Sequence, residues 1–188
     1  MPWPPARTGS RALSATSGDR AEGAGLPRGR RLALFCGLAV AVVALDQLVK
    51  AAMRALLVVG EPRALVPGVL DLSLVYNEGA AFSLGEGAGP LFVLVAVVIC
   101  ACGLWLAWRR TDAPMTLVAS VACVAGGGVG NAIDRVVAGR VTDFFATTFV
   151  DFAVFNVADV FITCGVVASF VLWARWDSAR ERAGAVGK

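Results

Sequence analysis

Several polar side chains lie at the ends of long apolar runs, where they could carry out chemistry. Asn156 and Asp159 stand at the front of one run, and Asn131 and Asp134 stand at the end of another. Asp143 lies between the two runs, in the stretch VTDFF. Ionisable groups within or against hydrocarbon are costly, and by default they indicate a functional site.

Paired acids offer a defined chemistry. Two carboxylates held close together cannot both ionise cheaply, so one keeps a proton while the other draws a proton from water, which then attacks a carbonyl. The sequence contains no histidine, which removes Ser-His triads, Cys-His pairs and most zinc sites. The residues alone leave three acids for the two places, Asp134, Asp143 and Asp159, and they call for no cofactor or metal.

The other polar groups have simpler interpretations. Asp46 and Lys50 are four apart and share one helical face, so they could form an ion pair at a helix end, although lysine can also snorkel to the interface. Asp134 is followed by Arg135, which favours structural pairing between these neighbours. Asn131 shares the face of Asp134 and could bond to backbone or substrate.

Two of the acids also have a structural alternative. Asp159 falls in the first turn of its expected helix, where a carboxylate is favoured by the helix dipole and can cap free N–H groups. Asp143 could be an ordinary loop residue, but its bulky neighbours Phe144 and Phe145 are unusual around an exposed acid.

The elements that must position these groups are membrane spans. The chain of 188 residues is 57% hydrophobic and 16% charged, with a mean hydropathy of +0.72. Four apolar runs, residues 32–53, 91–108, 115–133 and 157–176, are each close to the ~20 residues that cross a bilayer as a helix. We therefore expect an all-α integral membrane protein, with a basic disordered tail at 1–31, a four-helix membrane domain at 32–176 and a short tail at 177–188. The small net charge of +3 gives no support for nucleic-acid binding.

Charge predicts the orientation of the spans. Twelve basic residues fall on the side that holds both chain ends, and five fall on the other side. The positive-inside rule therefore predicts that both termini are cytoplasmic, and Trp105, Trp108, Trp173 and Trp176 would form an aromatic belt on that side. A cleaved signal peptide at 28–45 is the weaker alternative, because the apolar character resumes after Gln47 and no clear small-residue cleavage site is present.

The segments on the other side of the membrane, the glycines and the cysteines add further expectations about the fold. Leucines at 70, 72 and 74 alternate with polar residues, which predicts a strand and a small extracytoplasmic β element at the membrane surface. Gly126 and Gly130 have the spacing of close helix packing. The five cysteines lie in apolar runs, and they fit packing better than metal binding or a disulfide framework.

Taken together, the motifs resemble the lipoprotein signal peptidases (signal peptidase II). The matching stretches are DQLVK at 46–50, NEGAAFSL at 77–84, GGGVGNAIDRVVAGRVTDFF at 126–145 and FNVAD at 155–159. The resemblance covers about residues 32–176, and four motifs in this order are highly specific.

The resemblance implies an intramembrane aspartic endopeptidase of the bacterial cytoplasmic (inner) membrane. Such an enzyme cuts a lipid-modified prolipoprotein just before its diacylglyceryl cysteine, needs no cofactor, contacts membrane lipid, and is expected here to be a monomer. The family's catalytic pair falls on Asp143 and Asp159. The implied supporting or substrate-binding residues are Asp46, Lys50, Asn77, Asn131, Asp134, Arg135 and Asn156.

Three rival functions follow from the same residues. A proton pathway through a small transporter or channel would use Asp143, Asp159 and Lys50, but the charges gather at one face and do not cross the bilayer. A glycine-lined scaffold leaves the outer acids unexplained. A Ser-Lys peptidase could use Lys50 as base, but the outward serines, Ser73 and Ser83, have no recognisable partner spacing.

Overall fold

Four long helices and one small sheet make up the described part of the protein. A computed structural model describes residues 26–79 and 88–186. Its elements are α1 (Arg28–Leu56), β1 (Arg63–Val66), β2 (Leu70–Asn77), α2 (Gly89–Arg109), α3 (Met115–Ala138), β3 (Val141–Thr147) and α4 (Val157–Val186). All four helices are long and apolar enough to cross a membrane, where helices satisfy their own backbone hydrogen bonds. The predicted fold class is confirmed.

Helix α3 is the centre of the bundle. Within its most apolar window 56% of the residues are buried, whereas the other three helices bury 11–17% of theirs. Its glycines allow this packing, because a Cβ at Gly126 would lie 2.7 Å from the Ala39 carbonyl oxygen of α1. A Cβ at Gly127 would lie 2.6 Å from the carbonyl oxygen of Ala158 in α4. The glycine run therefore brings three backbones together, as its spacing predicted.

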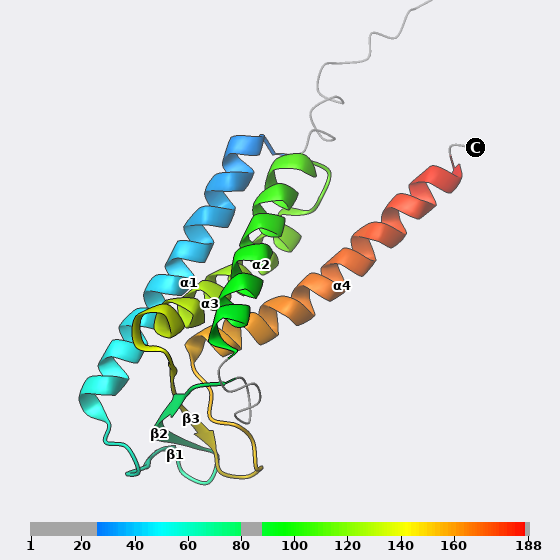
Figure 1. Cartoon of the computed structure of the whole chain (residues 1–188). Helices are drawn as coiled ribbons and strands as arrows, with labels where there is room; N and C mark the ends of the chain where they lie inside the picture. Colours follow the sequence, from blue (N-terminus) through cyan, green and yellow to red (C-terminus); the bar gives the residue numbers. More distant parts are fainter. Residues whose placement is uncertain (1–25, 80–87, 187–188) are drawn as a thin grey trace, which may run out of the picture.

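The start of α1 and the end of α4 lie at the same end of the bundle (Figure 1). From the sheet end, α4 leans away from the other helices along its length. Between α1, α2 and α3, an apolar core surrounds Phe35, Val118 and Ala122. Helix α4 packs along α3 from Ala158, which faces Gly127, to Ser169, whose hydroxyl donates to Ser120 at 2.8 Å, and only the rest of α4 extends away from the bundle.

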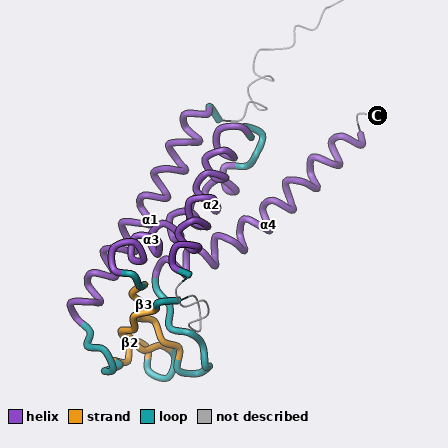
Figure 2. The backbone as a smooth tube through the Cα atoms, viewed as in Figure 1, coloured by secondary structure: helices purple, strands orange, loops and turns teal. Residues whose placement is uncertain are grey.

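The sheet lies at the opposite end of the bundle (Figure 2). It is antiparallel in the order β1-β2-β3, and Val75 of β2 pairs with Asp143 of β3. Leu74 and Phe144 from the sheet pack with Leu57 at the end of α1. Strand β2 matches the predicted strand. Strand β3 was not predicted, because its first four residues are all buried and so lack the alternation of a half-buried strand.

The boundaries of the first helix differ from the prediction. Residues 28–31, assigned to the tail, already belong to α1, and Arg31 is only 1% exposed. Its guanidinium donates to the carbonyls of Ala107 (3.2 Å), Ala113 (2.9 Å) and Arg110 (2.9 Å). These acceptors come from the last turn of α2 and from the α2–α3 connection, so each nitrogen of the buried guanidinium has an acceptor. Residues 1–25 of the predicted tail lie outside the described residues.

The other end of the chain also differs. Helix α4 continues to Val186, ten residues beyond the predicted span. Trp176 has two arginine neighbours there, since Arg110 lies 4.7 Å and Arg180 5.0 Å from its ring centroid. At the same end, Arg28 lies 5.5 Å from the ring centroid of Trp108. Tryptophan and arginine therefore gather at the bundle end away from the sheet, where the aromatic belt was predicted.

Candidate active site

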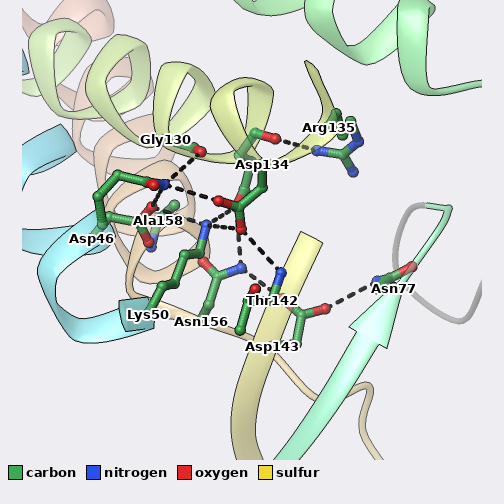
Figure 3. Close-up of polar contacts among 12 residues, drawn as sticks. Asp46, Lys50, Asn77, Gly130, Asp134, Arg135, Thr142, Asp143, Asn156 and Ala158 are labelled. Carbon is green, nitrogen blue, oxygen red and sulfur yellow. Dashed lines mark hydrogen bonds and ion pairs between the residues drawn. The ribbon is translucent and has the colours of Figure 1, made fainter. Parts of the chain in front are cut away.

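Asp143 lies on β3 with its carboxylate held from both sides. The side chain of Asn156 donates to Oδ1 at 2.6 Å, and Asn77 at the end of β2 donates to Oδ2 at 3.1 Å (Figure 3). Asp143 is only 3% exposed. The strand pairing that sequence patterns did not reveal therefore fixes both the position and the burial of this acid.

Asn156 and Asp159 are positioned by the first turn of α4. The Asp159 Oδ2 atom accepts the Asn156 backbone N–H at 3.0 Å, and Asn156 Oδ1 accepts the Asp159 N–H at 3.1 Å. This reciprocal arrangement is a capping box, so the capping alternative considered for Asp159 describes a real contact. Just before it, Phe155 pairs with Phe145 of β3 through backbone bonds of 2.8 and 3.0 Å. That bridge brings the start of α4 beside Asp143.

Asn131 of α3 connects the two acids to a lysine. Its amide nitrogen donates to Asp159 Oδ1 at 2.8 Å. Its amide oxygen accepts from Lys50 at 2.8 Å and from the Asn156 amide at 3.1 Å. The lysine can only donate, so it sets the orientation of the Asn131 amide and directs the NH₂ group to Asp159.

A buried ion-pair cluster lies behind Asn131. Lys50 Nζ is 2.9 Å from Asp46 Oδ2 and 3.2 Å from Asp134 Oδ2, with side-chain exposures of 0% for Lys50 and Asp46 and 5% for Asp134. The predicted Asp46–Lys50 pair is confirmed, and Lys50 does not snorkel to the surface. The predicted pairing of Asp134 with Arg135 is wrong, because consecutive residues of a helix point in different directions and Asp134 faces α1.

Arg135 instead points toward the segment that follows β2. It donates to the Gly79 carbonyl at 2.9 Å and to the Asn131 carbonyl at 3.3 Å, and its guanidinium lies 4.7 Å from the ring centroid of Phe92. Its Nε atom is buried with no hydrogen-bond partner. The arginine therefore stands beside the acids with a buried Nε–H donor that has no partner among the described residues.

The two acids line one cavity. It has a volume of about 610 Å³ and lies between α2, α3, α4 and the segment that precedes α4. Asn77, Asn131, Arg135, Asp143 and Asp159 form its polar part. Its remaining walls are largely apolar and include Phe92, Ile99, Phe155 and Ile162. The cavity thus combines an acid pair with a surface suited to a hydrophobic chain.

The surroundings of Asp143 change its acidity. Burial, and then the negative charge of Asp159, raise the pKa of Asp143 to about 6 from its ordinary value of 3.8. Hydrogen bonds from Asn77 and Asn156 and the charge of Lys50 oppose this rise only in part. An acid with this pKa can hold or release a proton near neutral pH.

Six hydrogen bonds at the site could not be inferred from residue types. Gln47 donates to Asp46, Asp134 and the Gly130 carbonyl at 3.1–3.2 Å. The Thr142 N–H bonds to Asp134 at 3.0 Å, the Thr142 hydroxyl accepts from Arg54 at 3.0 Å, and the Ala158 N–H bonds to Asp46 at 2.9 Å. Gln47, Thr142 and Ala158 had a sequence signal only through their places in the matching stretches, and Arg54 had none. Backbone N–H groups carry no signal of their own.

A family comparison covers the part of the chain that builds this site. The model of the family described as Signal peptidase (SPase) II matches residues 38–175. The chain belongs to the signal peptidase II family. The match includes all the site residues predicted from the sequence.

Signal peptidase II relatives and solved structures agree with this membership. The chain is 33% identical over 138 residues to a lipoprotein signal peptidase of Streptococcus pneumoniae, covering 73% of this chain and 90% of that protein. It is 36% identical over 135 residues to one of Streptococcus thermophilus, covering 71% and 88%. Two solved structures, each described as a bacterial membrane enzyme, superpose with TM-scores of 0.72 and 0.67 at 26% and 25% identity. They cover 84% and 79% of this chain, and 94% and 95% of their own.

Proposed function

We propose that this chain is an aspartic endopeptidase that removes the signal peptide from bacterial prolipoproteins, cutting before the lipid-modified cysteine. One observation carries the aspartic mechanism: the carboxylates of Asp143 and Asp159 line the same cavity and are both bonded to Asn156. Membership of the signal peptidase II family supports the substrate class.

The two acids take different roles in this mechanism. The pKa of Asp143, raised to about 6, supports this residue as the acid that holds a proton in the free enzyme as the pH falls toward 6. Asp159 accepts the Asn156 N–H and the Asn131 amide, and these two bonds hold its carboxylate in place in the cavity. Asp159 is then the general base that takes a proton from water. Asp143 donates a hydrogen bond to the substrate carbonyl and stabilises the tetrahedral intermediate.

The remaining predicted residues support this chemistry. Asn77 and Asn156 orient Asp143, and Asn131 orients Asp159. The free Nε of Arg135 is available to a substrate carbonyl. The apolar walls of the cavity suit a signal peptide and its lipid, which approach from the bilayer.

The active site lies on the extracytoplasmic side in this proposal. Both described chain ends lie at the end of the bundle away from the sheet (Figure 1). The basic residues concentrated there support a cytoplasmic location for both termini. The sheet then lies beside the outer headgroups, next to the cleavage site. Cysteine accessibility labelling from each side of the membrane would test this orientation.

Cleavage of a lipidated precursor by the purified protein, with chelator present, tests the function. We expect wild-type cleavage, and loss of at least about 10³-fold in kcat for Asp143→Asn and Asp159→Asn, because either change removes a group that transfers a proton or stabilises the intermediate. Asp151→Asn is the matched control, since this acid lies exposed in the loop before α4. Cleavage by either Asn variant at the wild-type rate would overturn the aspartic mechanism, and absence of cleavage in every version would favour transport. A Ser-Lys enzyme would instead lose activity only with Lys50→Ala.

Infrared carboxyl bands test the proton assignment. Asp143→Asn should remove the protonated-acid band, whereas Asp159→Asn should leave one. Loss of that band only in the Asp159 variant would refute the assignment. A pH profile alone cannot make it, because the pair titrates as a unit.

A further inference from the structure

Each proposed catalytic acid is preceded by a residue whose backbone N–H is held by a second, buried aspartate. We propose that Asp46 and Asp134, tied together by Lys50, form a positioning clamp that sets the separation of the Asp143 and Asp159 carboxylates. This inference rests on the proposed function and concerns how that site is held.

One arm of the clamp runs from α1 to α4. Asp46 Oδ1 accepts the N–H of Ala158 at 2.9 Å, and Ala158 immediately precedes Asp159. Asp46 is fully buried. A Cβ at Gly130 of α3 would lie 2.5 Å from Asp46 Oδ2, so the glycine leaves the space that the carboxylate occupies. The start of α4 is therefore fixed to α1 through a charged hydrogen bond.

The other arm runs from α3 to β3. Asp134 Oδ2 accepts the N–H of Thr142 at 3.0 Å, and Thr142 immediately precedes Asp143. Arg54 of α1 donates to the hydroxyl of the same threonine at 3.0 Å. Thr142, which precedes Asp143, is thus held through both its main chain and its side chain.

Lys50 joins the two arms. Its ammonium has three donors, and two of them match Asp46 Oδ2 at 2.9 Å and Asp134 Oδ2 at 3.2 Å (Figure 3). The third matches Asn131 Oδ1 at 2.8 Å. Gln47 makes a second tie, because its amide nitrogen reaches both Asp46 and Asp134. Any change in the distance between the two acids of the clamp would break at least one of these bonds.

A contribution to the stability of the fold does not by itself explain why these charged side chains are buried together. Three charged side chains are buried, and a buried ion pair often contributes no more to stability than well-packed apolar residues would. Positioning is a stronger reason, because the two proposed catalytic acids come from different elements and must hold one water between them. A displacement of about 1 Å can lower a rate by about 100-fold.

The pH profile separates positioning from simple support. The charged groups that interact with Asp143 are Asp159 from α4, Lys50 from α1 and Arg135 from α3. A clamp variant that keeps its charge changes the proton affinity of the pair only by changing its separation. If the acids move apart, they repel each other less, and the pair gives up its proton at lower pH.

The experiment uses the full chain and four variants, with kcat, KM and thermal unfolding measured for each. Asp46→Glu and Asp134→Glu keep the charge but displace the carboxylate by one methylene. Asp46→Asn and Asp134→Asn keep the size and the acceptor oxygen but weaken the tie to Lys50. Asp112→Asn is the control, since Asp112 bridges Arg110 (3.3 Å) and Arg180 (3.4 Å) at the other end of the bundle.

We expect kcat to fall about 10- to 100-fold in the clamp variants, with KM changed less than about threefold. In the Glu variants the alkaline limb of the kcat/KM profile should move to lower pH. Wild-type kcat and an unchanged profile in the folded variants would overturn the clamp, while inactive Asp143→Asn and Asp159→Asn enzymes left the proposed function intact. If a Glu variant fails to fold, the nearly isosteric Asn variant decides through its kcat. An active Asp143→Asn enzyme would overturn both proposals.

Discussion

Asn156 and Asp159 cap the start of α4 reciprocally, through bonds of 3.0 and 3.1 Å between the backbone N–H of each residue and the side chain of the other. The same Asn156 side chain also donates to Asp143 at 2.6 Å. Asn156 therefore serves both the helix cap and the proposed acid pair, because it bonds to Asp159 and to Asp143. A cap of this kind fixes Asp159 in the first turn and places a donor against Asp143.

Two substitutions at Asn156 should separate these roles. Asn156→Ala should lower the free energy of unfolding by about 1 kcal/mol through loss of the cap. Asn156→Ser keeps a capping oxygen but cannot reach Asp143, so it should retain most of the stability. Both variants should lose about 100-fold in kcat, measured by precursor cleavage alongside thermal unfolding in detergent. Full activity of Asn156→Ser would show that the donor to Asp143 is dispensable.

The packing of α3 against α4 makes a second prediction. Gly127→Ala would place a Cβ 2.6 Å from the Ala158 carbonyl oxygen, which is backbone and cannot move away alone. We expect a loss of about 1–3 kcal/mol in the free energy of unfolding from overpacking. Catalysis should also fall, because the first turn of α4 would shift with Asp159.

Gly128 provides the matched control for this prediction. A Cβ there would lie 3.4 Å from the Ala96 Cβ, at the edge of ordinary contact. Gly128→Ala should therefore unfold at the wild-type temperature or above it, since alanine favours a helix by about 1 kcal/mol over glycine. Equal destabilisation of the two variants would contradict the packing argument.

The raised pKa of Asp143 predicts how stability depends on pH. The pKa is about 6 in the folded protein against an ordinary 3.8, so between these values the folded state holds a proton that the unfolded chain releases. This contribution is fully present below about pH 4 and is lost as the pH rises through about 6. At about 1.4 kcal/mol for each pKa unit, the loss is about 3 kcal/mol.

Asp143→Asn removes this proton and so tests the effect. The unfolding temperature of the wild type, relative to that of the variant, should fall between about pH 4 and about pH 7. The comparison with the variant cancels the titrating groups that do not interact with Asp143, which the two proteins share. Parallel curves across this range would show that Asp143 titrates near its ordinary value.

Arg31 should be needed for stability and not for chemistry. Arg31→Met would leave the carbonyls of Ala107, Arg110 and Ala113 without their charged donor. Each bond to a charged group contributes about 1.5–3 kcal/mol, so we expect clear destabilisation by thermal unfolding. The kcat of the folded fraction should stay at the wild-type value, because the acids lie at the other end of the bundle. Arg30→Met, at an exposed position, should leave both quantities unchanged.

The amino-acid sequence by itself determined the spans, the predicted strand at 70–76 and the family. These depend on local chain properties: the length of an apolar run, the alternation of leucines, and the order of four motifs. The absence of histidine and the positions of the acids also limited the chemistry to a small set before any contact was known. Because these signals are local, they can be recognised in the sequence without knowledge of how the helices pack.

Tertiary structure alone decided which groups meet. Asp134 faces Lys50 of α1 and not its neighbour Arg135, and Arg31 is buried because its acceptors come from residues more than seventy positions away. Strand β3 forms because β2 pairs with it. The N–H groups of Thr142 and Ala158 matter only because the folded chain places them against Asp134 and Asp46. The physical reason is that hydrogen bonds and ion pairs act over a few ångströms, and residues distant along the chain come within that range only when the helices pack.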